Sequence, residues 1–170
     1  MKISSFTLPR MFCLALAAPM LLSGCAQQAP GIDESSTVIA DAANAEPVDA
    51  REQYALGVQY QTADGVPKDD AKALAWLRKA ADQGLAEAQL YIGWMYQTGD
   101  GVAQDDAQAL AWIGKAAQQG LADAQVYLGW MYQNGLGVAQ DKVQAVAWYR
   151  QAAEQGSPEA QASLDVLLAQ

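Results

Sequence analysis

The chain has 170 residues, 2 cysteines, no histidine and a formal net charge of −9 at neutral pH. Without histidine it lacks the Ser–His and Cys–His pairs of many hydrolases, as well as the usual zinc-ligand sets. An acidic surface argues against binding to nucleic acid, and against binding to anionic lipid through charge.

The first 24 residues have the features of an export signal. Lys2 and Arg10 supply positive charge, and the apolar run MFCLALAAPMLL follows at residues 11–22. This run is too short to span a bilayer, and Pro19 interrupts it. Removal of residues 1–24 would leave 8 basic and 19 acidic residues, so the mature chain would carry a net charge of −11.

The apolar run ends in LSGC at residues 22–25, which resembles the lipobox of bacterial lipoproteins. In that family the chain is cut before the cysteine, which is acylated by fatty acids such as palmitate. The resemblance implies lipid attachment at Cys25. It also implies an outer-membrane lipoprotein facing the periplasm, because Ala26 stands where an inner-membrane retention aspartate would be. The alternative is an ordinary secretory signal with a chance cysteine. Because Cys13 lies within the signal, no disulfide is expected.

Residues 26–50 contain no aromatic and no basic residue, but they carry several acids, serines and prolines. A segment of this composition has little apolar surface to bury. We therefore predict that residues 25–50 form a lipidated, flexible tether and that the folded domain occupies residues 51–170.

From residue 53 the chain aligns with itself, without a gap, at a constant step of 36 residues. A fixed period of this length is typical of a solenoid. Three units are predicted at residues 53–88, 89–124 and 125–160, and residues 161–169 begin a fourth as a C-terminal capping helix. The repeated positions include Gln53, Gln89, Gln125 and Gln161; Gly57, Gly93 and Gly129; Tyr60, Tyr96 and Tyr132; and Trp76, Trp112 and Trp148.

Each unit is predicted to contain two helices joined by a glycine-rich turn such as TGDGV or NGLGV. Apolar residues at helical spacing form one stripe per helix, and Trp112 is expected to be a buried residue of its stripe. Asp69 and its repeats stand where helix N-caps belong, and Gly84 and its repeats stand where helices end. The stripes comprise Ala88, Ile92, Met95 and Tyr96 in a first helix, and Ala73, Trp76, Leu77, Ala80 and Ala81 in a second helix.

This pattern resembles the Sel1-like repeat, a relative of the tetratricopeptide repeat, with the unit AxxxLGxxYxxGxGVxxDxxxAxxWxxxAAxxG. The resemblance implies an all-α, right-handed α-solenoid that acts as a protein-binding scaffold. The chain departs from the pattern at Ala63, which replaces a turn glycine, and at Asp165 in the unfinished fourth unit. Gly114 lies inside a helix, at a local cost of about 1 kcal/mol.

Acid pairs occur at Asp69-Asp70 and Asp105-Asp106, with Asp100 nearby. They could form a calcium site or a general acid–base pair, or they could cap helices. Because they recur with the turns of the repeat, capping is the favoured interpretation. We therefore predict no catalytic residue, no metal site and no cofactor, and we expect that the protein is not an enzyme.

The family pattern accounts for the glycine and tyrosine of GWMYQ, but it does not account for Trp94 and Trp130. Trp94 points away from the core stripe of its helix and shares a face with Tyr91. In solenoids of the family that the chain resembles, the first helices line the concave surface. We therefore predict a partner-binding ladder there, although rings that fill gaps between units are the alternative, and the tyrosines suit either role equally. The ladder comprises Tyr91, Trp94, Tyr127 and Trp130, and its flanking amides are Gln61, Gln97 and Gln133.

The leading hypothesis is a non-catalytic scaffold, anchored to membrane in the periplasm, that binds an unidentified protein on its concave aromatic face. Neither nucleic acid nor a small-molecule substrate is expected. The resemblance suggests one alternative, an immunity protein that neutralises a secreted phospholipase-type antibacterial effector. A second alternative, a peptidoglycan hydrolase of the cell envelope, would need an acid pair that converges in a pocket.

Overall fold

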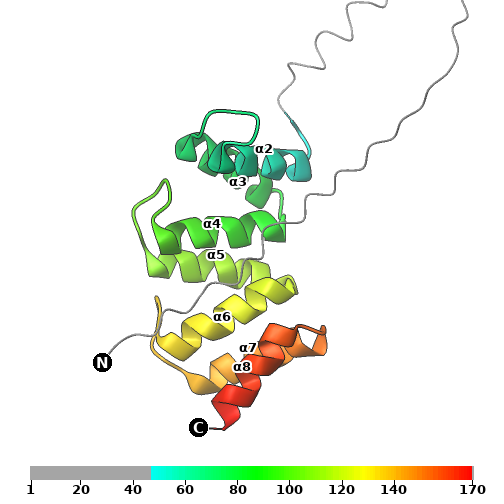
Figure 1. The fold of residues 1–170 in the computed structure, drawn as a ribbon, viewed down its shortest axis with the longest axis vertical. Helices are drawn as coiled ribbons and strands as arrows, with labels where there is room; N and C mark the ends of the chain where they lie inside the picture. The colour runs from blue at the N-terminus through cyan, green and yellow to red at the C-terminus, as the bar shows by residue number, and fades with distance from the viewer. Residues whose placement is uncertain (1–46, 170) are drawn as a thin grey trace, which may run out of the picture. The chain divides into compact units, whose positions relative to one another are not determined.

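The computed structural model describes residues 47–169, which form seven α-helices and no strand within that range. Figure 1 shows the helices stacked in chain order. This architecture confirms the predicted all-α solenoid. The predicted signal peptide, Cys25 and most of the predicted tether lie outside the described residues. The helices are α2 (Ala50–Thr62), α3 (Asp70–Asp82), α4 (Ala86–Thr98), α5 (Asp106–Gln118), α6 (Ala122–Asn134), α7 (Lys142–Glu154) and α8 (Pro158–Leu168).

The second helix of each pair begins at an aspartate cap, as the repeat pattern predicts. The Asp69 carboxylate accepts a hydrogen bond of 3.0 Å from the backbone N–H of Lys72. Asp105 and Asp141 each accept two such bonds in α5 and α7. These bonds satisfy N–H groups that have no partner inside the helix. The capping interpretation of the repeated aspartates is therefore confirmed.

Residues 47–49, which belong to the region predicted as tether, contact the first helix pair. Asp49 caps α2 through the backbone N–H of Arg51, and the Gln53 amide donates 2.8 Å to the carbonyl of Pro47. The Gln83 amide, at the end of α3, donates 3.0 Å to the carbonyl of Val48. These contacts tie residues 47–49 to the first helix pair.

Glycines on the first helices let each pair of helices approach closely. A Cβ added at Gly93 would lie 2.5 Å from Cγ1 of Ile113 and 3.1 Å from the carbonyl oxygen of Ala109. Gly57 and Gly129 meet α3 and α7 in the same way. The backbones of α4 and α5 therefore pack against each other at a distance that a larger residue would prevent.

Three apolar clusters connect successive pairs, because each joins the second helix of one pair to the first helix of the next. We call them the α3/α4, α5/α6 and α7/α8 clusters. Their main buried members are Leu74, Leu77, Ile92 and Met95 in the first; Ile113, Ala116, Leu128 and Met131 in the second; and Ala145, Tyr149, Leu164 and Leu167 in the third.

Trp112 differs from its predicted role as a buried stripe residue. The ring is half-buried, packs against the α3/α4 cluster and has the Lys115 ammonium 4.1 Å from its centre. The fully buried residues of α5 include Ala109 and Ile113. Because Ile113 points into the core, Trp112 lies about 100° around the helix, at the edge of the packed face.

Candidate partner-binding face

Two tyrosine–tryptophan pairs occupy equivalent places on α4 and α6. The ring centres of Tyr91 and Trp94 lie 5.6 Å apart with an interplanar angle of 67°, and those of Tyr127 and Trp130 lie 5.3 Å apart at 58°. Three-residue spacing on a helix produces this contact. Tyr54 on α2 adds an edge contact to Tyr91 at 6.2 Å. We call Tyr91, Trp94, Tyr127 and Trp130 the aromatic strip.

The members of the aromatic strip differ in burial. Tyr91 is 9% exposed and belongs to the α3/α4 cluster, whereas Trp94, Tyr127 and Trp130 are half-buried. Trp94 packs against the α3/α4 cluster, and Trp130 packs against both the α5/α6 and α7/α8 clusters. The strip therefore combines packing between repeats with partly exposed indole surface, and Tyr91 contributes mainly to the core.

The strip tyrosines are bonded to the glutamines that were predicted to flank them. The Tyr91 hydroxyl donates 2.8 Å to Oε1 of Gln61, and the Tyr127 hydroxyl donates 2.6 Å to Oε1 of Gln97. Gln133 receives its bond of 2.8 Å from Tyr149 on α7. The side-chain oxygen of Gln97 therefore joins two repeats, whereas that of Gln133 joins the two helices of one pair. The interval of 30 residues that separates Gln61 from Tyr91 and Gln97 from Tyr127 is the signal of these bonds in the sequence.

The pKa of Tyr91 is raised to about 12, mainly by burial and to a smaller extent by the nearby Tyr54, Asp100 and Asp70. Burial also raises the pKa of Tyr127 to about 12, with a smaller contribution from Asp106. Both phenols are consequently protonated donors at physiological pH.

A second set of amides, in which the buried Gln89 and Gln125 bond to glutamines at helix ends, links the helices. The Gln119 amide donates 2.8 Å to Oε1 of Gln89, and the Gln89 amide donates 3.3 Å to the carbonyl of Ala81 in the preceding repeat. The same arrangement recurs with Gln155, Gln125 and Ala117. Buried amides need hydrogen-bond partners, so these glutamine bonds fix the alignment of each helix pair on the next.

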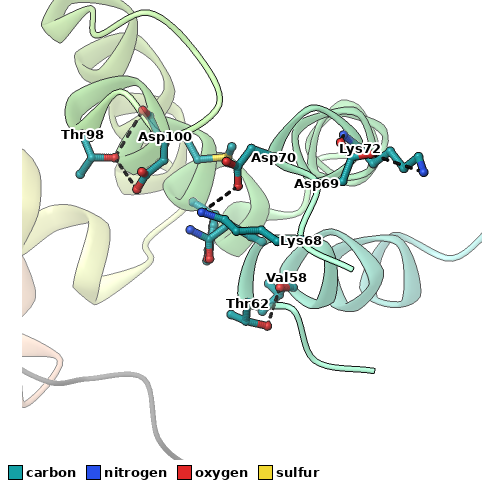
Figure 2. A network of polar contacts seen from close by, with 11 residues as sticks. Val58, Thr62, Lys68, Asp69, Asp70, Lys72, Thr98 and Asp100 are labelled. Carbon is teal, nitrogen blue, oxygen red and sulfur yellow. Dashed lines mark hydrogen bonds and ion pairs between the residues drawn. The ribbon is translucent and has the colours of Figure 1, made fainter. Parts of the chain in front are cut away.

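Several acids near the turns have structural partners, although one buried carboxylate oxygen of Asp106 has no hydrogen-bond partner. Lys68 forms an ion pair of 3.4 Å with Asp70, and the Thr98 hydroxyl donates a hydrogen bond of 3.0 Å to Asp100 (Figure 2). The pKa of Asp69 is lowered, first by its hydrogen bond from the Lys72 backbone. Among residues 47–169, no group of three acid or cysteine side chains could hold a metal ion.

None of the helices in this part of the chain combines the length and apolar character needed to cross a membrane.

The chain is similar to several solved solenoid structures. A Sel1 repeat protein from Oxalobacter formigenes shares 40% identity at a TM-score of 0.67, over 76% of this chain and 97% of that one. A protective antigen with an SLR fold, present in uropathogenic Escherichia coli, also shares 40% identity at a TM-score of 0.68. That match covers 78% of this chain but 28% of the antigen.

A cysteine-rich protein (hcpB) of Helicobacter pylori shares the fold, at 24% identity and a TM-score of 0.57, over 68% of this chain and 89% of that chain. No curated protein matches the sequence. The family model of the Sel1 repeat matches residues 53–85, 86–121 and 122–157. These units follow the helix pairs α2/α3, α4/α5 and α6/α7, and together they cover more than half of the chain. The chain therefore belongs to the Sel1 repeat family.

Proposed function

We propose that the protein is a non-catalytic scaffold, attached to the periplasmic face of the outer membrane through lipid on Cys25, that binds a protein partner on the aromatic strip. Sel1 repeat proteins generally mediate protein–protein interactions. The main support for this choice of binding surface is that one tyrosine–tryptophan pair recurs at the same place on α4 and α6.

Within the strip, Trp94 and Trp130 are the proposed anchors. The pattern of the repeat does not require an indole at either position, and each ring is half-buried. Tryptophan is enriched among the residues that dominate binding energy at interfaces. Tyr91 and Tyr127 contact these indoles and are held by their bonds to Gln61 and Gln97, so they position the anchors.

The support for membrane attachment is the LSGC segment with its preceding charged and apolar regions. An acidic chain would gain little from electrostatic attraction to anionic lipid, so acyl chains would have to supply the attachment.

The experiment uses the tagged full-length protein as bait in solubilised cell envelope, followed by purification of the captured partner. The partner is then titrated against Trp94→Ala and Trp130→Ala. Each variant should weaken the complex by about 2 kcal/mol, roughly thirtyfold in affinity. Trp112→Ala is the matched control, because Trp112 is also half-buried but lies on a second helix. It should lower the melting temperature and leave affinity unchanged.

Equal affinity of the wild type and both strip variants, together with a large loss of their thermal stability, would show that these indoles are packing residues. The aromatic strip would then not be the binding surface.

A further inference from the structure

Both helices of the aromatic strip carry an acid two turns before the indole. Glu87 precedes Trp94 by seven residues on α4, and Asp123 precedes Trp130 by seven residues on α6. Seven residues are close to two helical turns, so acid and indole lie on the same face of each helix. Burial raises the pKa of Tyr54, and the charge of Glu87 raises it as well, so this carboxylate lies close to a ring beside the strip. Carboxylates therefore border the aromatic strip.

These carboxylates have no cation of their own in the described part of the chain. Glu87 and Asp123 are exposed, and the ion pairs formed within residues 47–169 involve other acids. Asp106 also lies near the strip, because its charge adds to the effect of burial in raising the pKa of Tyr127. The strip therefore offers negative charge beside its rings to an incoming cation.

The basic residues of the chain are concentrated on other helices. Neither α4 nor α6 contains a lysine or an arginine, and the same is true of the turns at residues 99–105 and 135–141. The helices that carry the strip are thus acidic, although cations are present nearby in the sequence. Of the eight basic residues within residues 47–169, six lie on the second helices, namely Lys72, Arg78, Lys79, Lys115, Lys142 and Arg150.

Two tryptophans of the second helices show how an indole of this protein is paired with a cation. The ammonium groups of Lys79 and Lys115 lie 3.9 Å and 4.1 Å from the ring centres of Trp76 and Trp112, which precede them by three residues. At that spacing each strip tryptophan is followed by a glutamine. Within residues 47–169 no lysine or arginine lies over a strip indole. A partner with basic side chains would supply this cation.

The chain itself offers no suitable occupant for the strip. Residues 26–46 contain acids but no lysine or arginine, so charge opposes their docking beside Glu87 and Asp123. Two copies that met through their strips would likewise bring like charges together. Charge complementarity therefore favours a different protein, with a basic segment.

We propose that the aromatic strip selects a basic segment of its partner protein. Arginine or lysine side chains of that segment would lie over the indoles of Trp94 and Trp130 and pair with the carboxylates of Glu87 and Asp123. This inference rests on the proposed function, because it defines the chemistry of the partner at the same surface.

The probe is a fluorescein-labelled peptide of repeated Arg-Gly-Ser units. Its matched control carries citrulline, a neutral analogue of the same shape, in place of every arginine. Binding to the full-length chain, purified in mild detergent, is measured by fluorescence anisotropy at low and at physiological salt. The arginine peptide should bind saturably and more weakly as salt rises. The citrulline peptide should bind about tenfold more weakly.

Variants of the chain assign the binding to the strip. Trp94→Ala and Trp130→Ala should each weaken binding of the arginine peptide about tenfold. Glu87→Gln and Asp123→Asn should each weaken it about threefold, because an exposed ion pair contributes little, and should reduce its salt dependence. Glu154→Gln is the matched control, because it removes an exposed acid from the second helix α7. It should bind the peptide as the wild type does, and thermal melts verify that all variants fold.

Three results would overturn the proposal. The first is the absence of saturable binding of the arginine peptide. The second is equal binding by the wild type and by the tryptophan and acid variants of the strip, since the peptide would then be attracted by the acidic chain as a whole. The third is equal binding of the arginine and citrulline peptides, since the strip would then bind without regard to charge.

The partner captured from the cell envelope separates this inference from the proposed function. Its complex should be weakened by Glu87→Gln, by Asp123→Asn and by added salt. If only Trp94→Ala and Trp130→Ala weaken it, the strip binds the partner but the choice of a basic segment is wrong. If none of the four variants weakens it, the proposed function is wrong as well.

Discussion

The phenol of Tyr149 on α7 donates a 2.8 Å hydrogen bond to Oε1 of Gln133 on α6. In the two preceding repeats the equivalent glutamine receives its bond from a tyrosine of the next first helix, Tyr91 or Tyr127. At the third such position α8 carries Ser163. The donor has therefore moved from the following helix to the helix of the same pair, and every glutamine of the series keeps a phenol partner.

This exchange predicts a rescue between two positions. Leu77 and Ile113 occupy the positions equivalent to Tyr149 in the two preceding repeats, so Tyr149→Ile makes the third repeat apolar there as well. The variant leaves the Gln133 oxygen without its donor, which should lower the free energy of unfolding by about 1–3 kcal/mol. Adding Ser163→Tyr supplies the donor from α8, as in the earlier repeats, and should recover most of the loss. Urea unfolding measures both variants. If the double variant is no more stable than Tyr149→Ile, the tyrosine on α8 does not replace the one on α7.

The buried phenols predict a loss of stability in alkali. Burial raises the pKa of Tyr149 to about 12, while a hydrogen bond with Ser163 acts in the opposite direction. The pKa values of Tyr91 and Tyr127 are also raised to about 12. Because the folded-state pKa exceeds the unfolded value of about 10, their stabilisation is complete below pH 10 and declines as pH rises toward 12.

Thermal melts from pH 8 to pH 12, together with tyrosinate absorbance, measure this effect. Tyr127→Phe should flatten the alkaline decline relative to the wild type. Titration of all the tyrosines near pH 10 in the folded chain would contradict it.

Two glycines in helices should respond to alanine in opposite directions. No heavy atom beyond its own helix and chain neighbours lies within 4 Å of a Cβ added at Gly114, so Gly114→Ala should stabilise the fold by about 0.5–1 kcal/mol. Gly93→Ala would place a methyl group against Ile113 and the carbonyl of Ala109, and should destabilise by about 1–3 kcal/mol. Chemical denaturation measures the free energy of unfolding of both variants. Equal changes in the two variants would show that α4 and α5 tolerate a wider separation.

Replacement of Cys25 tests the lipobox. Cys25→Ser removes the thiol that would carry the lipid, so the precursor should stay uncleaved or the protein should be released from membrane. Labelled palmitate incorporation and membrane fractionation measure the outcome, with Cys13→Ser as the matched control. Continued fractionation of correctly cleaved Cys25→Ser protein with the outer membrane would exclude lipid attachment at this residue.

Local patterns in the sequence were sufficient to predict the helices, turns and aspartate caps, because these features depend on residues within one or two helical turns of each other. Asp69, Asp105 and Asp141 cap the helices that the repeat predicted. The constant period of 36 residues was sufficient to predict the solenoid, because helices that recur at a fixed interval bury their apolar stripes by stacking on their neighbours.

The tertiary structure decided how deeply each side chain is buried and which partner it has. A helical wheel places Tyr91 and Trp94 on one face, but neighbours from other repeats make Tyr91 a core residue and leave Trp94 half-buried. Likewise Trp112 shares a predicted stripe with buried alanines, yet it lies at the edge of the packed face. The periodicity of one helix gives the direction of a side chain, whereas its burial depends on the helices that stack on both sides in a solenoid.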